Sequence, residues 1–158
     1  MTHRRMSSFF AVFICFTFGS AFSIVAAPPD PCALLTPAQG GAALGGTLSA
    51  GKSVGGNLCL WHQEGKTGAA LLQLDVNVIT VDRYAHMKSV TTGTITNVGG
   101  LGDDAYYSTL KTGATTITTL NIKKGATAVV IRVSGGQKPV EEYQAKEKAV
   151  AQAIVPKL

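Results

Sequence analysis

Leu72-Gln73-Leu74-Asp75-Val76-Asn77-Val78 is the stretch of sequence that decides the fold. Leucine and valine occupy every second position, and glutamine, aspartate and asparagine occupy the positions between them. A period of two residues is typical of a strand with one buried and one polar face, as in antiparallel sheets. We therefore predict a strand over residues 69–80 and place it in an antiparallel sheet.

Further strands are predicted on both sides of this one. Residues 58–64 form a predicted strand, and the link Gly65-Lys66-Thr67-Gly68 is short enough to make a hairpin with residues 69–80. Three more strands, joined by glycine-bearing turns, are predicted over residues 105–110, 115–123 and 126–133. Residues 94–97 are a candidate short strand inside a loop. Because the turns leave no room for a crossover, these strands should also pair antiparallel.

Three helices are predicted around this sheet. Thr36 and Pro37 form a helix start, with the hydroxyl as N-cap, and Gly45-Gly46 ends that helix. Residues 82–90 and a segment from Pro139 to about residue 155 are the other two. The predicted fold class is α+β, an antiparallel sheet covered by helices in the order α-β-β-α-β-β-β-α, and residues 28–158 are predicted to form one globular domain.

The first 27 residues have the layout of a secretory signal peptide. His3-Arg4-Arg5 is a basic head, residues 9–27 are largely apolar, and small residues lead into Pro28-Pro29. An uncleaved membrane anchor is the alternative, because about 20 apolar residues can span a bilayer as a helix. The hydroxyls, the glycine and the following prolines favour cleavage, and hence a periplasmic or secreted domain without stable membrane insertion.

The charge of the predicted mature domain argues against one class of partner. Removing Arg4 and Arg5 from the 14 Lys and Arg of the chain leaves 12 against 9 Asp and Glu, a net charge of +3. The basic residues are scattered, and Lys123-Lys124 is their one adjacent pair after the signal peptide. Without a basic stripe interleaved with aromatic residues, the sequence does not favour nucleic-acid binding.

Two cysteines remain once Cys15 is removed with the signal peptide. In an oxidising compartment the pair Cys32 and Cys59 is most simply a disulfide. The alternative is a metal site, because Cys59 and His62 have a spacing seen among metal ligands. Both lie in a predicted strand, where side chains three apart point to opposite faces. We therefore expect the disulfide and no metal or other cofactor.

Residues 46–55 match two catalytic motifs in their letters. Gly46-Thr47-Leu48-Ser49-Ala50-Gly51-Lys52-Ser53 fits the P-loop pattern, and Gly51-Lys52-Ser53-Val54-Gly55 fits the nucleophile elbow of hydrolases. Both motifs need a strand before the loop and a helix after it, whereas here a helix end precedes and a strand follows. We predict a flexible loop over residues 47–57, and a small serine hydrolase using Ser53 is the third hypothesis for function.

Other residues that could carry chemistry have simpler structural interpretations. Asp103-Asp104 is a predicted turn before a strand, although two carboxylates could also bind a cation. His86 is a predicted exposed helix residue, and Trp61 a predicted core residue beneath the first helix. Tyr106 and Tyr107 should point to opposite sheet faces, which makes one of them a candidate exposed contact.

Glu147 falls within the apolar stripe of the last predicted helix. We expect its side chain to reach solvent at the margin of that stripe, and a paired buried carboxylate is the alternative.

The polar side of the central strand is the predicted binding face, together with the loop 47–57. Its candidate residues are Gln73, Asp75, Asn77, Arg132, Lys52 and Ser53. The leading hypothesis for function is a non-enzymatic binding or accessory domain for an envelope protein or a small ligand. The second is an envelope structural or inhibitor protein that acts by surface contact, which predicts an exposed apolar or aromatic patch rather than a pocket.

Three stretches carry a family resemblance. They are Asp30-Pro31-Cys32-Ala33-Leu34-Leu35-Thr36-Pro37-Ala38-Gln39 with Ala43-Leu44-Gly45, then Cys59-Leu60-Trp61, then Gly100-Leu101-Gly102-Asp103-Asp104-Ala105-Tyr106-Tyr107. In this order they resemble a family of small exported bacterial proteins of unknown function, many of them actinobacterial envelope lipoproteins. The family pattern is a D-P-C-x-L-L-T opening, a C-x-W strand and a G-[LV]-G-D-x-A-[YW] turn.

The resemblance implies a PsbP/Mog1-like α/β/α sandwich with the two cysteines bridged, and it implies no family-wide activity. This chain lacks a lipobox, so the resemblance does not extend to a lipid anchor.

Overall fold

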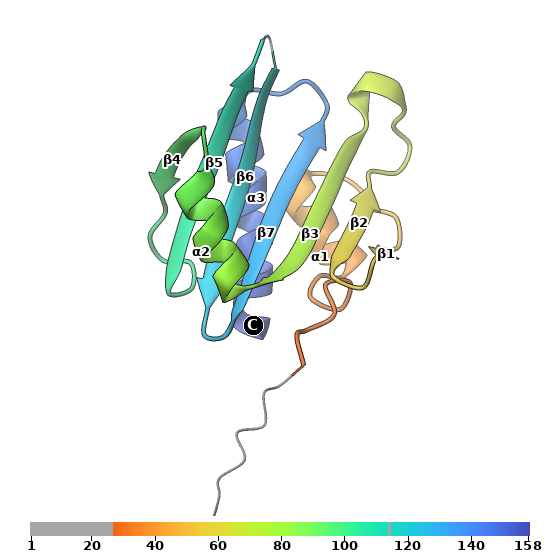
Figure 1. The fold of residues 1–158 in the computed structure, drawn as a ribbon. Coiled ribbons are helices and arrows are strands. Elements are labelled where there is room, and N and C mark those ends of the chain that lie inside the picture. Colours follow the sequence, from red (N-terminus) through yellow and green to blue (C-terminus); the bar gives the residue numbers. More distant parts are fainter. Residues whose placement is uncertain (1–26, 114) are drawn as a thin grey trace, which may run out of the picture.

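The computed structural model describes residues 27–113 and 115–158, so the predicted signal peptide lies outside the described residues except for Ala27. Within them the chain adopts an α+β fold with one seven-stranded antiparallel sheet and three α-helices (Figure 1). The strands are β1 (Lys52–Val54), β2 (Leu58–His62), β3 (Leu72–Thr80), β4 (Thr94–Asn97), β5 (Asp104–Thr112), β6 (Thr115–Lys124) and β7 (Thr127–Gly135). The helices are α1 (Pro37–Leu44), α2 (Val81–Val90) and α3 (Val140–Ile154), with short 3-10 helices η1 (Gly68–Ala70) and η2 (Val155–Lys157).

The strand order is β1-β2-β3-β7-β6-β5-β4, and every neighbouring pair is antiparallel. β3 and β7 pair from Leu72↔Gly135 to Thr80↔Thr127 at the centre of the sheet. Both sides of β3 are occupied, by β2 and β7. After β3 the chain therefore continues into α2 and then forms β4 at the far edge of the sheet. β4 to β7 then follow one another back to the centre.

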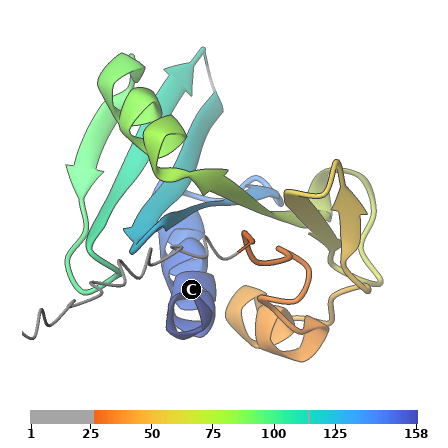
Figure 2. The same cartoon turned by 60° about the horizontal axis from the view of Figure 1, so that its bottom comes forward.

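The helices lie on both faces of the sheet (Figure 2). α1 and α3 cover one face, and α2 alone lies on the other, which we call the α2 face. The main core fills the space under α1 and α3, and it takes the alternate apolar residues of β3 from Leu72 to Val78, as the sequence predicts. A smaller cluster under α2 consists of Ile79, Tyr84, Tyr106 and Ala128.

The N-terminal segment is held by a helix cap and a disulfide. Thr36 Oγ1 accepts a hydrogen bond from the Gln39 backbone, and Gln39 Oε1 accepts one from the Thr36 backbone, which makes a capping box at the start of α1. Cys32 is bonded to Cys59 of β2, with Cα atoms 5.2 Å apart, and this confirms the predicted disulfide. Trp61, on the same side of β2, is fully buried in the main core, as predicted.

Two strands extend the predicted order of elements. β1 lies within residues 47–57, which we predicted to be a flexible loop, and β4 coincides with the candidate strand. Gly55 and Gly56 have φ of 62° and 78°, a region that glycine adopts without strain, so the chain can reverse between β1 and β2. The observed order is α-β-β-β-α-β-β-β-β-α, and the P-loop-like segment leads into a strand rather than a helix.

Removal of the disulfide should destabilise this fold measurably. The bridge closes a loop of 27 residues, so the free energy of unfolding should fall by about 3 kcal/mol in the Cys32→Ala/Cys59→Ala variant. Urea unfolding of both proteins measures the difference, and a reductant should lower the midpoint of the wild type alone. Equal unfolding free energies for the two proteins would contradict the prediction.

Candidate functional site

Alternation along the strands places most of the predicted binding residues on the α2 face. Asp75 pairs with Leu60 of β2, and Leu60 pairs with Lys52 of β1, so the three side chains share one side of the sheet. The predicted residues on this side are Gln73, Asp75, Asn77, Arg132 and Lys52. Ser53 pairs with Cys59, which faces the main core, and therefore belongs to the opposite side.

Asp75 is the centre of a polar network on this face. Its Oδ1 accepts a hydrogen bond from Gln73 Nε2 at 2.7 Å, and its Oδ2 accepts two from Arg132, from Nε at 3.0 Å and from Nη2. The Asp75 residue is only 7% exposed, whereas the Arg132 side chain is 46% exposed. Both carboxylate oxygens therefore have partners inside the protein, and the guanidinium is the part of this network that faces solvent.

The α2 face also carries exposed apolar side chains. Tyr106 packs under α2, and Leu110 lies four residues further along β5, so Leu110 and its cross-strand partner Ile117 point to the same side. Ile95 pairs with Ser108 of β5, between these two positions, and shares that side. All three apolar side chains are exposed.

Val90, at the end of α2, extends this exposed group. The loop after Val90 lies directly against β5, because a Cβ added at Gly93 would be 2.3 Å from the Thr109 carbonyl oxygen. We call Val90, Ile95, Leu110 and Ile117 the apolar corner. Val54, at the opposite edge, also lies on the α2 side, because its neighbour Ser53 lies on the other. Each large hydrophobic side chain that is exposed in the described part of the chain is thus on this side.

The apolar corner was not predicted from the sequence, and the local pattern of its residues explains why. Ile95 and Ile117 each stand alone between two threonines, and Leu110 follows a threonine and precedes a lysine. Threonine fits either face of a sheet, so such patterns do not say which side is covered.

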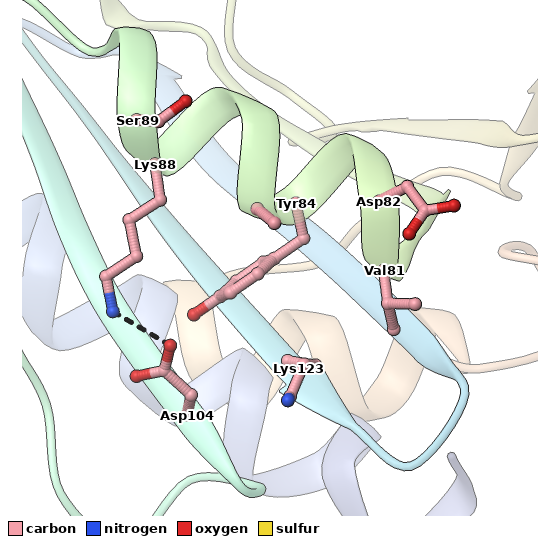
Figure 3. Close-up of a pocket in the computed structure, with 8 residues that line it drawn as sticks. Val81, Asp82, Tyr84, Lys88, Ser89, Asp104 and Lys123 are labelled. Carbon is pink, nitrogen blue, oxygen red and sulfur yellow. Dashed lines mark hydrogen bonds and ion pairs between the residues drawn. The ribbon is translucent and has the colours of Figure 1, made fainter.

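A cavity of about 560 Å³ lies between α2 and the neighbouring ends of β5 and β6 (Figure 3). Lys88 Nζ lies 2.8 Å from Asp104 Oδ2, and this hydrogen-bonded ion pair lowers the pKa of Asp104. The Tyr84 hydroxyl points toward that carboxylate but makes no hydrogen bond with it. The pKa of Tyr84 is raised mainly by burial and, to a smaller extent, by the nearby Asp104. With Asp82 and Lys123 the lining has two residues of each charge, so it selects neither an anion nor a cation.

Tyr106 and Tyr107 are both buried, which corrects the prediction that one of them is an exposed contact. The Tyr106 ring meets Tyr84 edge-on under α2, with ring centres 5.4 Å apart. The Tyr107 hydroxyl donates a hydrogen bond to the Gln144 carbonyl of α3 at 2.6 Å on the other face. Burial, and after it the nearby Glu147, raises the pKa of Tyr107 to about 12. Both rings are thus packing residues of the two layers.

The serine and histidines considered for catalysis do not converge on one side of the sheet. Ser53 and His62 belong to opposite sides of the sheet, and His86 is an exposed residue of α2, as predicted. Asp104 is the first residue of β5 rather than part of a turn, and Asp103 Oδ2 accepts a hydrogen bond from the Gly125 backbone, between β6 and β7, at 2.7 Å. Across residues 27–113 and 115–158, no group of three His, Cys, Asp or Glu is placed to hold a metal ion.

Glu147 of α3 is fully buried, which corrects the prediction that it reaches solvent. β6 and β7 pair only as far as Leu120↔Ile131, whereas β7 continues beside β3 to Gly135. Beyond that point Glu147 Oε1 accepts a hydrogen bond from the Val133 backbone at 3.1 Å, and no hydrogen bond within the described part reaches Oε2. Burial raises the pKa of Glu147 to about 8, against smaller opposing effects of the Val133 bond and of Arg132.

Two further findings bear on function. No helix in the part of the chain that the structure describes is long and apolar enough to cross a membrane. Comparisons of the chain with protein-family models, with curated proteins and with solved structures find no match.

The buried Glu147 carboxyl should make the stability of the protein fall as pH rises. The folded protein keeps this proton up to about pH 8, whereas the unfolded chain loses it near pH 4.5, so stability is lost between these values. The Glu147→Gln variant cannot lose a proton there. Its free energy of unfolding should therefore rise relative to that of the wild type by about 3–5 kcal/mol between pH 4 and pH 8.

Urea unfolding at pH 4, 6 and 8 measures this difference. Glu141→Gln, an exposed carboxyl of the same helix, is the matched control and should leave the pH profile of the wild type unchanged. A constant difference between Glu147→Gln and the wild type at all three pH values would show that the carboxyl is not protonated in the folded protein.

Proposed function

We propose that this chain is an exported, non-enzymatic binding domain that contacts a partner protein through its α2 face. The predicted signal peptide and the Cys32–Cys59 bridge support a periplasmic or secreted location, because disulfides persist in oxidising compartments. The proposal joins the first two functional hypotheses of the sequence analysis. It assigns no cofactor.

One observation carries the proposal: the exposed large hydrophobic side chains of the described residues all lie on the α2 side. Exposed apolar residues scattered over a surface need no explanation, whereas residues gathered on one side of a sheet are typical of an interaction surface. Four of them form the apolar corner, and the half-exposed Arg132 guanidinium lies on the same face. Apolar centres combined with arginine are a common composition of protein interfaces.

The polar residues of this face support binding by surface contact rather than capture of a small molecule. Both oxygens of Asp75 already accept hydrogen bonds from Gln73 or Arg132, and Asn77 Oδ1 accepts one from Asn57 Nδ2 at 3.0 Å. A small ligand needs several convergent groups that are free to bind it. On this face such groups satisfy one another, so the contact area has a preformed polar centre and an apolar margin.

We further propose that the chain belongs to the family of small exported proteins that its sequence resembles, with a PsbP/Mog1-like sandwich. The roles of the matching residues support this proposal. Cys32 and Cys59 form the bridge, Thr36 caps α1, and Trp61 fills the core beside the bridge. Gly102 has a φ of 63°, and a Cβ there would lie 2.4 Å from the Lys123 carbonyl oxygen, so this turn requires glycine.

The test of the proposed function compares two variants in the source organism's envelope. Leu110→Glu/Ile117→Glu puts two charges into the apolar corner, and capture of the partner should fall by about tenfold or more because the charges would be buried on binding. The matched control is Lys111→Gln/Thr116→Glu, which makes the same change in net charge on the opposite side of the same two strands.

A photoreactive residue at position 117 should crosslink the same partner, and one at position 111 should not. Circular dichroism checks that both variants are folded. If Leu110→Glu/Ile117→Glu captures and crosslinks the same proteins as the control, the α2 face is not the contact surface.

A further inference from the structure

Within residues 27–113 and 115–158, β4 ends the sheet and pairs with β5 alone, so its other edge is free there. The Val98 backbone donates to the Ala105 carbonyl at 2.8 Å, so Val98 directs its backbone groups toward β5. The direction of the backbone N–H and C=O groups alternates along an antiparallel ladder. Those of Thr94 and Thr96 therefore also point toward β5, whereas those of Ile95 and Asn97 point away from the sheet. The outer edge of β4 thus presents two N–H groups and two carbonyls in the spacing of an unpaired strand.

Apart from its length of four residues, β4 lacks the features by which sheet edges are normally blocked. Residues 91–102 contain no charged residue and no proline, and all four residues of β4 are exposed. Edge strands are usually protected by lysine, proline, a bulge or very short length. The other edge of the sheet has such protection, since β1 is three residues long, begins with Lys52 and lies between glycines.

The free edge adjoins the apolar corner. The backbone groups of Ile95 point to the free edge, and its side chain lies on the α2 face. On that face Leu110 of β5 is its diagonal neighbour. A strand added beside β4 would place every second side chain on that face, next to Ile95. Backbone pairing and apolar contact would therefore be available to the same segment.

We propose that the partner binds by strand addition: an extended segment pairs with β4 and sets an apolar side chain against Ile95. This inference rests on the proposed function and names its mode of recognition. Only a polypeptide backbone matches the alternating donors and acceptors of such an edge, so the occupant is an extended peptide segment.

Charge favours a foreign segment over a second copy of this chain. The predicted mature domain has a net charge of +3, so two copies repel each other, whereas the edge itself adds no charge that would exclude a neutral or acidic peptide. We therefore assign the edge to a neutral or acidic segment with at least one apolar residue at an alternating position.

The probe for this test is a synthetic peptide obtained by selecting random 12-residue peptides displayed on phage against the full chain. Asn97→Pro removes one outward N–H without breaking the β4–β5 ladder, since Asn97 does not bond to β5. Asn97→Ala keeps that N–H and is the matched control. We expect the dissociation constant of the peptide to rise by about tenfold or more in Asn97→Pro and to change little in Asn97→Ala.

Hydrogen exchange provides the second measurement. The amides of Ile95 and Asn97 should exchange rapidly in the free protein and slowly with the peptide bound, whereas the Thr96 amide should be protected in both. Equal affinity for Asn97→Pro and Asn97→Ala, or no added protection at Ile95, would overturn strand addition. If Leu110→Glu/Ile117→Glu still abolishes capture, the proposed function survives that result with a different mode of contact. A chain that is dimeric until Asn97→Pro is introduced would assign the edge to a second copy instead.

Discussion

The pairing of β3 with β7 is the constraint on which the rest of the structure depends. It joins the middle of the chain to residues 127–135 and makes them the centre of the sheet. With both edges of β3 occupied, the next strand cannot form a hairpin with it, so α2 carries the chain across one face to β4. A helix of ten residues is about 15 Å long, whereas a seven-stranded sheet is about 29 Å wide. α2 therefore covers only part of its face.

This difference in cover determines the chemistry of the two faces. Under α1 and α3 the strands place leucine, isoleucine and valine in one continuous core. On the α2 face a small apolar cluster suffices beneath the helix, and the strands beyond it carry polar or isolated apolar residues. Asp75 is nearly buried there because the Arg132 side chain lies over it, and long basic side chains can cover a surface while their charged group stays in water. The apolar corner consists of the last residue of α2 and of strand residues beyond it, and neither the helix nor this network buries them.

Local patterns in the sequence were sufficient for much of the fold. The period of two predicted β3, the Thr36-Pro37 and Gly45 signals predicted α1, and the isolated cysteine pair predicted the disulfide. Which side chains become buried beneath other elements was less predictable, because burial depends on contacts between distant residues. Asp75 and Arg132, for example, are 57 residues apart. The burial of Tyr106 and Glu147 and the exposure of Leu110 are of this kind, and β1 is too short for a period to be visible.

The exposed corner also belongs to the part of the sheet that separates from its centre. β5 and β6 pair to the end of their hairpin, at Thr112↔Thr115, while β6 and β7 stop pairing at Leu120↔Ile131. Leu110 and Ile117 therefore lie where β5 and β6 are paired without support from β7. Glu147 satisfies the Val133 N–H that faces this gap, so the centre of the sheet is complete without β6 there. The β3–β7 pairing that holds the core is therefore complete without the outer part of the β5–β6 hairpin, where Leu110 and Ile117 lie.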